Sequence, residues 1–184
     1  MRRQVIACFL GLYACSGLAC DPKAIIDDQP AHSAWWLRIS FTPCEQSIFG
    51  VAVDKIHPEW VRASALRKEY IPASALFETG HDALAQFGKT FELDGDFNGD
   101  KRADRAVVGV YEEAGGNRGL FVAVFTEAAK NTWRPVFLHA FAASRGILLL
   151  QQRGSVIRVW SCNECDGFGN LRWDRKLGKY AWGK

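Results

Sequence analysis

Apolar and polar residues alternate in short runs along the second half of the chain, and turn-forming residues separate these runs. The predicted strands cover residues 91–93, 105–112, 120–125, 133–141, 147–152, 156–161, 170–175 and 179–182. Short turns of Gly, Asn and Asp, such as 114–117, join antiparallel strands into a meander. No helical segment lies between the strands, which argues against a parallel α/β sheet. We therefore predict a mainly β fold, an antiparallel meander in a propeller-like or sandwich arrangement.

The first half of the chain has a less regular pattern. Residues 34–42 alternate well enough to predict a first strand. Pro58 and Glu59 suit the first turn of a helix, and Ile71-Pro72 would end it. We therefore predict one short N-terminal helix over 58–69, whose inner stripe contains Trp60, Val61, Ser64, Ala65 and Leu66. A second helical piece is predicted around 81–86.

The N-terminus has the features of a secretory signal. Arg2 and Arg3 precede an apolar stretch that is too short to span a membrane and ends in small residues. We expect residues 1–19 to be a signal peptide, 20–32 to be a polar tether, and 33–184 to form one domain. The predicted location is the periplasm of a Gram-negative bacterium, either free or anchored to the inner or outer membrane by a lipid.

The position of that lipid is left open between two cysteines. The segments 12–15 and 17–20 each resemble a lipoprotein cleavage box, with Cys15 or Cys20 as the modified residue. Lipid on Cys15, or cleavage after Ala19 without a lipid, leaves Cys20, Cys44, Cys162 and Cys165 as an even set. Lipid on Cys20 leaves three. An even number of cysteines suits an oxidising compartment, so parity favours the first two schemes.

Composition narrows the class of partner. The formal net charge is +3, hydrophobic residues make up 48% of the chain and charged residues 23%. Lys and Arg are scattered rather than clustered, so we expect no nucleic-acid binding.

The acidic segment 94–104 carries the most specific chemistry in the chain. Asp96, Asn98, Asp100 and Asp104 occupy positions 1, 3, 5 and 9 of a loop, and the backbone carbonyl of Arg102 occupies position 7. Calcium is bound by six to eight oxygens, which a short chain supplies at alternate positions as it curls around the ion. We predict that these five residues bind Ca²⁺. The alternative is a turn rich in Asp, Asn and Gly that binds no metal.

A second register of the same loop fails. Starting from Asp94 gives the opening of an EF-hand, with Asp94, Asp96 and Asn98 followed by a glycine. Position 12 is then Arg105, where an EF-hand requires a bidentate Glu. The flanking sequence is also strand-like rather than helical.

The segment from Gly95 to Asp104, followed by an apolar strand, resembles the calcium loops of FG-GAP repeats in integrin-type propellers. The resemblance covers about 15 residues and implies that Asp96, Asn98, Asp100 and Asp104 are side-chain ligands in a loop between two adjacent strands. Lys101 departs from the pattern, because the family usually has Gly there. If this position needs a positive φ, Lys costs on the order of 1 kcal/mol. We therefore expect weak, structural calcium binding.

The segment Cys162-Asn163-Glu164-Cys165 is predicted to be structural. A zinc ribbon needs a second ligand pair, which the sequence lacks, and the glycines after Cys165 do not suit the helix of a thioredoxin-like site. We expect these cysteines to form disulfides, either with each other or with Cys20 and Cys44.

No known catalytic motif surrounds any of the four histidines, so we expect a non-enzymatic protein. Its predicted partner is a periplasmic protein, with contacts from Gly167, Phe168, Trp173, Tyr180 and their neighbours, because aromatic residues anchor interfaces. In size, export signal and loop, the chain is similar to periplasmic lysozyme inhibitors and immunity proteins. That similarity implies a peptidoglycan hydrolase as partner. An envelope hydrolase with an unrecognised site and a cell-wall carbohydrate-binding module are the alternatives.

Overall fold

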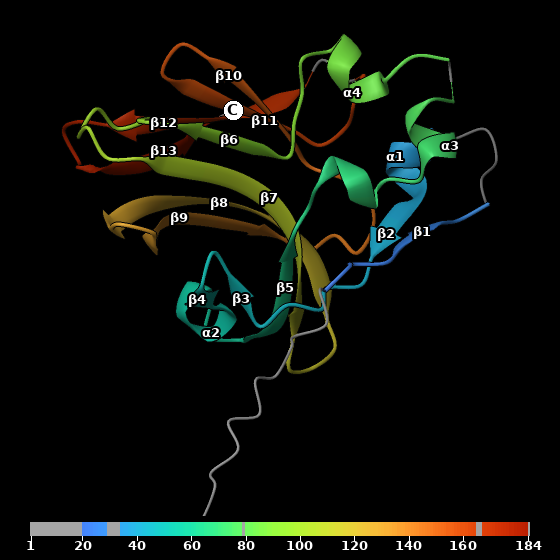
Figure 1. The fold of residues 1–184 in the computed structure, drawn as a ribbon, viewed down its shortest axis with the longest axis horizontal. Helices are drawn as coiled ribbons and strands as arrows, with labels where there is room; N and C mark the ends of the chain where they lie inside the picture. The colour runs from blue at the N-terminus through green and yellow to red at the C-terminus, as the bar shows by residue number, and fades with distance from the viewer. Residues whose placement is uncertain (1–19, 29–33, 79, 165–166, 184) are drawn as a thin grey trace, which may run out of the picture.

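The computed structural model describes residues 20–28, 34–78, 80–164 and 167–183 (Figure 1). The protein is mainly β, with 49% of residues in strands and 12% in helices, and its sheets are antiparallel. This confirms the predicted fold class. The predicted signal peptide and the end of the predicted tether, residues 29–32, lie outside the described residues.

The largest sheet has five strands in the order β5-β7-β8-β9, with β6 also paired to β7. Its strands are β5 (Trp60–Ala65), β6 (Glu92–Gly95), β7 (Asp104–Glu113), β8 (Arg118–Ala129) and β9 (Thr132–Phe141). β7 pairs with β8 along one side, while β6 and β5 pair in succession with its other side. The loop between β6 and β7 therefore joins two neighbouring strands of one sheet.

A second sheet is a four-stranded meander in the order β10-β11-β12-β13. Its strands are β10 (Leu149–Arg153), β11 (Val156–Trp160), β12 (Phe168–Asp174) and β13 (Lys179–Gly183). Gly154 and Gly178, with φ angles of 59° and 61°, lie in two of its turns, where a positive φ favours glycine. The pattern of short strands and Gly-containing turns predicted both hairpins.

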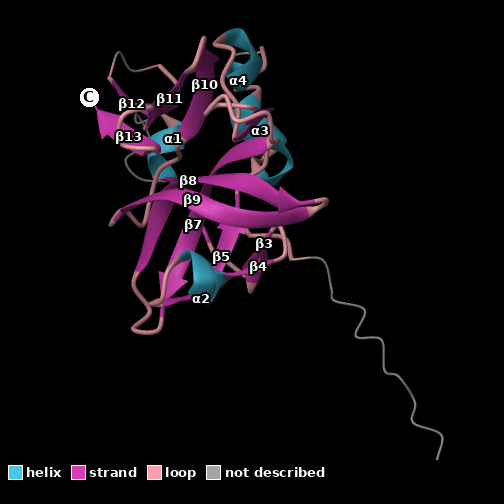
Figure 2. Cartoon of the chain, turned by 90° about the vertical axis from the view of Figure 1, so that its left-hand side faces the viewer, coloured by secondary structure: helices cyan, strands magenta, loops and turns pink. Residues whose placement is uncertain are grey.

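Other elements lie over both faces of the five-stranded sheet, as Figures 1 and 2 show, and its central strands β7 and β8 are the most buried. Ala106, Val108 and Val110 of β7 join the larger core, together with residues of β10–β13. Val107 and Tyr111 of β7 point to the opposite face and join a smaller core. The smaller core is covered by β3 (Ser47–Ile48), β4 (Val51–Ala52) and α2 (Val53–Ile56). Burial on both faces explains why β7 and β8 are apolar at nearly every position.

The predicted helix over 58–69 is wrong. Residues 60–65 form β5, which pairs with β7 from Glu113 to Gly109, and Val61 is 43% exposed instead of facing the core. Pairing with the open side of β7 outweighs the local helix-start signal at Pro58-Glu59, as tertiary contacts commonly do. Only a single 3-10 turn, Lys68–Tyr70, precedes the predicted stop at Ile71-Pro72.

The predicted strand over 34–42 is partly wrong. It begins with one helical turn, α1 (Trp35–Arg38), and only β2 (Ile39–Phe41) is extended. β2 pairs with β1 (Ala24–Ile26), so the predicted tether contains a strand. Trp35 is buried in the larger core at 2% exposure, which the helical turn makes possible by turning it inward.

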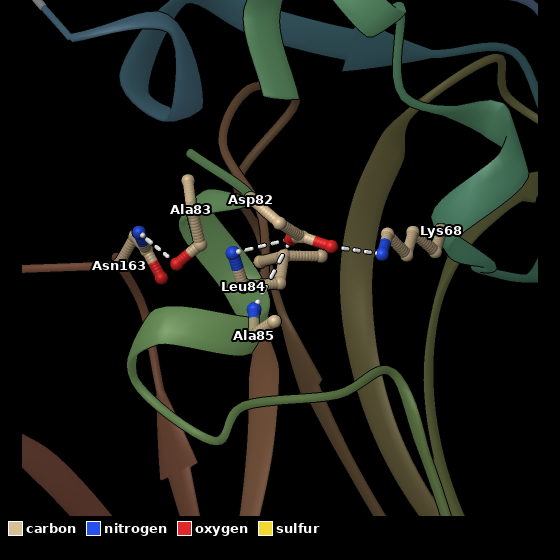
Figure 3. A network of polar contacts seen from close by, with 6 residues as sticks. All are labelled: Lys68, Asp82, Ala83, Leu84, Ala85 and Asn163. Atoms are coloured by element: carbon tan, nitrogen blue, oxygen red, sulfur yellow. Dashed lines mark hydrogen bonds and ion pairs between the residues drawn. The ribbon is translucent and has the colours of Figure 1, made fainter. Parts of the chain in front are cut away.

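Two further helical turns follow, α3 (Ala73–Leu76) and α4 (Ala83–Gln86). The second confirms the helical piece predicted around 81–86. Asp82 caps α4, because its carboxylate accepts hydrogen bonds from the backbone N–H groups of Leu84 and Ala85, both at 3.1 Å (Figure 3). The Lys68 ammonium bonds the same carboxylate and holds the pKa of Asp82 below its usual value. The Asn163 amide donates to the Ala83 carbonyl at 3.0 Å, which ties α4 to the segment after β11.

Candidate metal centre

The acidic loop joins β6 to β7 and lies beside the β12–β13 hairpin at one end of the sheets (Figure 1). Strands flank it on both sides: Gly95 and Asp104 are the last residue pair of the β6–β7 ladder. Asp94 lies inside this ladder, and its carboxylate bonds Arg105 Nε at 2.7 Å. The geometry thus excludes the EF-hand register, which needs helices and a free Asp94.

The side chains of the loop turn toward its own backbone. Asp96 accepts hydrogen bonds from the N–H groups of Gly99 at 2.7 Å and Lys101 at 2.9 Å. Asn98 accepts one from Asp100 N–H at 2.8 Å, and Asp100 accepts one from Arg102 N–H at 2.9 Å. These bonds hold the chain in a tight curl. A carboxylate has about four lone-pair positions, so each acidic side chain keeps capacity for a further ligand.

The backbone of the loop has two residues in the left-handed region. Gly99 has a φ of 80° and Lys101 a φ of 68°. The first suits glycine, whereas the second puts a lysine in a conformation that favours glycine. Lys101 therefore costs on the order of 1 kcal/mol relative to glycine, as the sequence predicted for a positive φ.

Asp104 is the buried member of the set, with no exposed surface. Its Oδ2 accepts hydrogen bonds from Phe97 N–H at 3.0 Å and from the Tyr180 hydroxyl at 2.9 Å. Its Oδ1 is buried and has no hydrogen-bond partner. A buried carboxylate oxygen without a partner costs roughly 1–3 kcal/mol or more, so the chain alone leaves this side chain incompletely satisfied.

A second unpartnered oxygen lies beside it. Thr126 of β8 is directly opposite Asp104 in the ladder, and side chains of directly opposite residues share one face of a sheet. Thr126 is 1% exposed, and its hydroxyl also has no hydrogen-bond partner. Two buried oxygens without a hydrogen-bond partner therefore lie on neighbouring strands at the base of the acidic loop.

The pKa of Tyr180 on β13 is affected by the negative charges of the loop. Burial raises the pKa of Tyr180 far above its ordinary value, and the hydrogen bond to Asp104 and the charges of Asp104, Asp100 and Asp96 raise it further. The side chain is 5% exposed and packs in the larger core. Little of the Tyr180 surface is therefore exposed for the predicted partner contact.

Arg105 does not neutralise the loop, although it follows it directly in sequence. Its guanidinium bonds Glu92 at 3.0 Å as well as Asp94, and it packs against the rings of Phe49 and Trp133. Among the described residues, Asp96, Asp100 and Asp104 take part in no ion pair. Three carboxylates with no cation paired to them are what a bound divalent cation would compensate.

The side chains do not converge on one point in this conformation. Within the residues that the structure describes, no three His, Cys, Asp or Glu side chains form a group that could hold a metal. Asp96, Asn98 and Asp100 are occupied in part by loop amides. Binding would require a small rearrangement in which their remaining lone pairs turn toward the Arg102 carbonyl and Asp104.

The remaining predicted contact residues lie in two places. Trp173 is partly buried on β12 and lines two hollows on either side of the loop. Phe168 and the exposed Gly167 instead line a hollow farther along the second sheet with Trp182. The hydrogen bond from Tyr180 to Asp104 could not be predicted from the sequence, because the two residues lie 76 positions apart.

Two of the predicted disulfide cysteines bond each other. Cys20 and Cys44 form a disulfide with a Cα–Cα distance of 5.8 Å, and the buried Ser64 hydroxyl accepts a hydrogen bond from Cys44 N–H at 3.1 Å beside it. Cys162 is also disulfide-bonded. Cys165 lies outside the described residues.

None of the described helices is long and apolar enough to cross a membrane.

The chain matches no protein-family model, no curated protein and no solved structure. No relative therefore supplies a function for the loop.

Proposed function

We propose that this chain is an exported, non-enzymatic calcium-binding protein of the bacterial envelope that acts by binding another protein. The observation that carries the calcium assignment is the buried Asp104 Oδ1, which has no partner at the base of a loop with three further oxygen-bearing side chains. Asp96, Asn98, Asp100 and Asp104 would supply side-chain oxygens, and Arg102 its backbone carbonyl. The ion would hold β6 and β7 in register and neutralise the loop.

The Cys20–Cys44 bridge supports export, because disulfides persist in oxidising compartments such as the periplasm. The bridge also uses the Cys20 thiol, which is then not available for a lipid. Any lipid anchor would therefore be attached to Cys15.

For the partner, we propose a peptidoglycan hydrolase of the envelope, which this protein would inhibit. The support is the combination of export signal, disulfide and rigid β scaffold. A pull-down from envelope extract with wild-type protein in calcium should recover a muramidase and reduce its activity on peptidoglycan. No effect on any peptidoglycan hydrolase would contradict the inhibitor role and leave the calcium assignment intact.

Calcium binding is tested by thermal unfolding with calcium and with chelator. A ligand present at 100 times its Kd stabilises the folded state by about 2.7 kcal/mol, which for a chain of this size raises Tm by roughly 5–10 °C. Asp100→Ala should abolish this rise. Asp94→Asn is the matched control, because Asp94 lies in the ladder beside the loop and is paired with Arg105; it should keep the rise. If wild type and Asp100→Ala melt alike in both conditions, the calcium assignment is wrong.

A further inference from the structure

With one oxygen from each side chain, the loop does not fill the coordination shell of a calcium ion. If each of the four side chains gives one oxygen and Arg102 gives its carbonyl, the chain contributes five ligands. Calcium takes six to eight, so about one to three positions stay open to water or to oxygens of another molecule. Asp96, Asn98 and Asp100 are exposed or half-buried, whereas Asp104 is buried. The open positions therefore face outward, on the solvent side of the ion.

Basic side chains border this outward face. One hollow of about 450 Å³ is lined by Asn98 and Asp100 of the loop and by Arg134 of β9 and Lys179 of β13. A second hollow of about 240 Å³ is lined by Asp96 and Asn98 on the loop side and by Arg175 of the hairpin. In the part of the chain that the structure describes, Arg134, Arg175 and Lys179 take part in no ion pair.

Trp173 lies between the two hollows and lines both of them. Its ring makes a T-shaped contact with the Tyr180 ring, with centroids 5.0 Å apart, and Tyr180 in turn donates to Asp104. A half-buried Trp that is braced from below has the character of an interface anchor. An acidic loop, three cations and a half-buried Trp thus line the same two hollows.

We propose that the calcium-loaded loop and this basic rim bind an acidic polypeptide segment of the partner. One carboxylate of that segment completes the coordination of calcium, and others pair with Arg134, Lys179 and Arg175. This inference rests on the proposed calcium site and names the chemistry of the partner that the site would recognise. Without the metal, the loop carboxylates repel the same segment, so partner binding depends on calcium.

A polypeptide fits these features better than an acidic polysaccharide. Flat sugar rings stack on an open aromatic face, whereas Trp173 is half-buried and its ring is already in T-shaped contact with Tyr180. Cations in both hollows suit a chain that carries carboxylates on separate side chains. Trp is also enriched at the centres of protein–protein interfaces.

The test uses the full mature chain and a fluorescently labelled peptide of eight glutamates as the probe, with anisotropy as the readout. We expect binding in calcium and at least a tenfold weaker Kd in chelator. Arg134→Gln and Lys179→Gln should each weaken binding in calcium by about two- to fivefold, the range expected for exposed ion pairs. Lys55→Gln is the matched control, because Lys55 is an exposed cation on α2 outside both hollows; it should bind as wild type.

Thermal unfolding in calcium without peptide separates the two proposals. If calcium raises Tm but the peptide does not bind, or binds equally in chelator, the partner inference is overturned and the calcium site stands. The same holds if Arg134→Gln and Lys179→Gln bind like Lys55→Gln. If an acidic polysaccharide such as polygalacturonate binds and the peptide does not, the polypeptide assignment is overturned. If calcium does not raise Tm at all, both proposals fail.

Discussion

Two charged side chains are buried among the residues that the structure describes, Asp104 and Lys89, and their surroundings differ. Lys89 is 8% exposed and lies behind α4. Its ammonium donates to the Asn163 carbonyl at 2.5 Å and lies within 3.4 Å of the Cys162 carbonyl. It also lies 3.9 Å from the centroid of the Trp160 ring. An ammonium has three donors, and here two carbonyls and a ring face meet them. Asp104, by contrast, has one oxygen with two donors and one with none.

This difference in hydrogen-bond partners distinguishes a charge that only stabilises the fold from a charge that is suited to bind a ligand. Burial lowers the pKa of Lys89, but the surrounding carbonyls fix its position, and through it the segment that contains Cys162. The Asn163 Oδ1 nearby is also buried without a partner, yet it belongs to a neutral amide, which costs less to leave unpaired than a carboxylate. An ionised group that the fold itself leaves incompletely satisfied is the stronger pointer to a bound ion.

Replacing the satisfied charge should have the largest effect. Lys89→Met keeps the length of the side chain but removes the ammonium that bonds the Cys162 and Asn163 carbonyls. Each carbonyl left unpaired costs about 1–3 kcal/mol, so we expect a loss of about 3 kcal/mol in the free energy of unfolding, measured in denaturant. The loss should be equal in calcium and in chelator, because Lys89 lies outside the loop. A loss that appears in only one of the two conditions would contradict the structural assignment.

Replacing the unsatisfied charge should change the free energy of unfolding by an amount that depends on calcium. Asp104→Asn keeps the shape of the side chain and removes its negative charge. In chelator we expect a change of less than about 1 kcal/mol, because the charge that lacked a partner is gone. In calcium the variant should lose most of the roughly 2.7 kcal/mol that saturating ligand gives the wild type. Isothermal titration with calcium checks this directly, and unchanged affinity would remove Asp104 from the ligand set.

Tyr180 links the loop to the second sheet, and its removal should have a smaller effect. Tyr180→Phe removes one of the two donors to Asp104 Oδ2 and should cost about 1–2 kcal/mol at neutral pH. The raised pKa of Tyr180 means that the folded state holds this proton more tightly than the unfolded state. Its contribution is complete below the ordinary tyrosine pKa of 10.0 and is lost as the pH rises above it.

Chemical unfolding from pH 8 to 11 checks this prediction. The wild type should lose stability steeply above pH 10, and Tyr180→Phe should lose it less steeply. Part of the decline should persist in the variant, because burial also raises the pKa values of Tyr70 and Tyr111. Parallel curves for the two proteins would show that Tyr180 does not sense the loop.

The sequence predicted the structural features that depend on residues close together in the chain. The loop between two strands and the hairpin at Gly178 both follow from local residue chemistry and are present in the structure. The helix over 58–69 was wrong because β5 is determined by pairing with β7, about 45 residues later. The contacts of Tyr180 and Arg134 with the loop region depend on how the two sheets stack, which no spacing in the sequence encodes.

The smallest predicted effect concerns Lys101, where strain and charge can be separated. Lys101→Gly removes both the side chain from its φ of 68° and a cation beside the loop carboxylates. We expect about 1 kcal/mol of stabilisation in chelator and tighter calcium binding. Lys101→Ala removes the cation but keeps the Cβ atom that causes the strain. It should therefore tighten calcium binding without the stabilisation in chelator. If the two variants are equally stable in chelator, the strain assigned to residue 101 is absent, and charge alone weakens the loop.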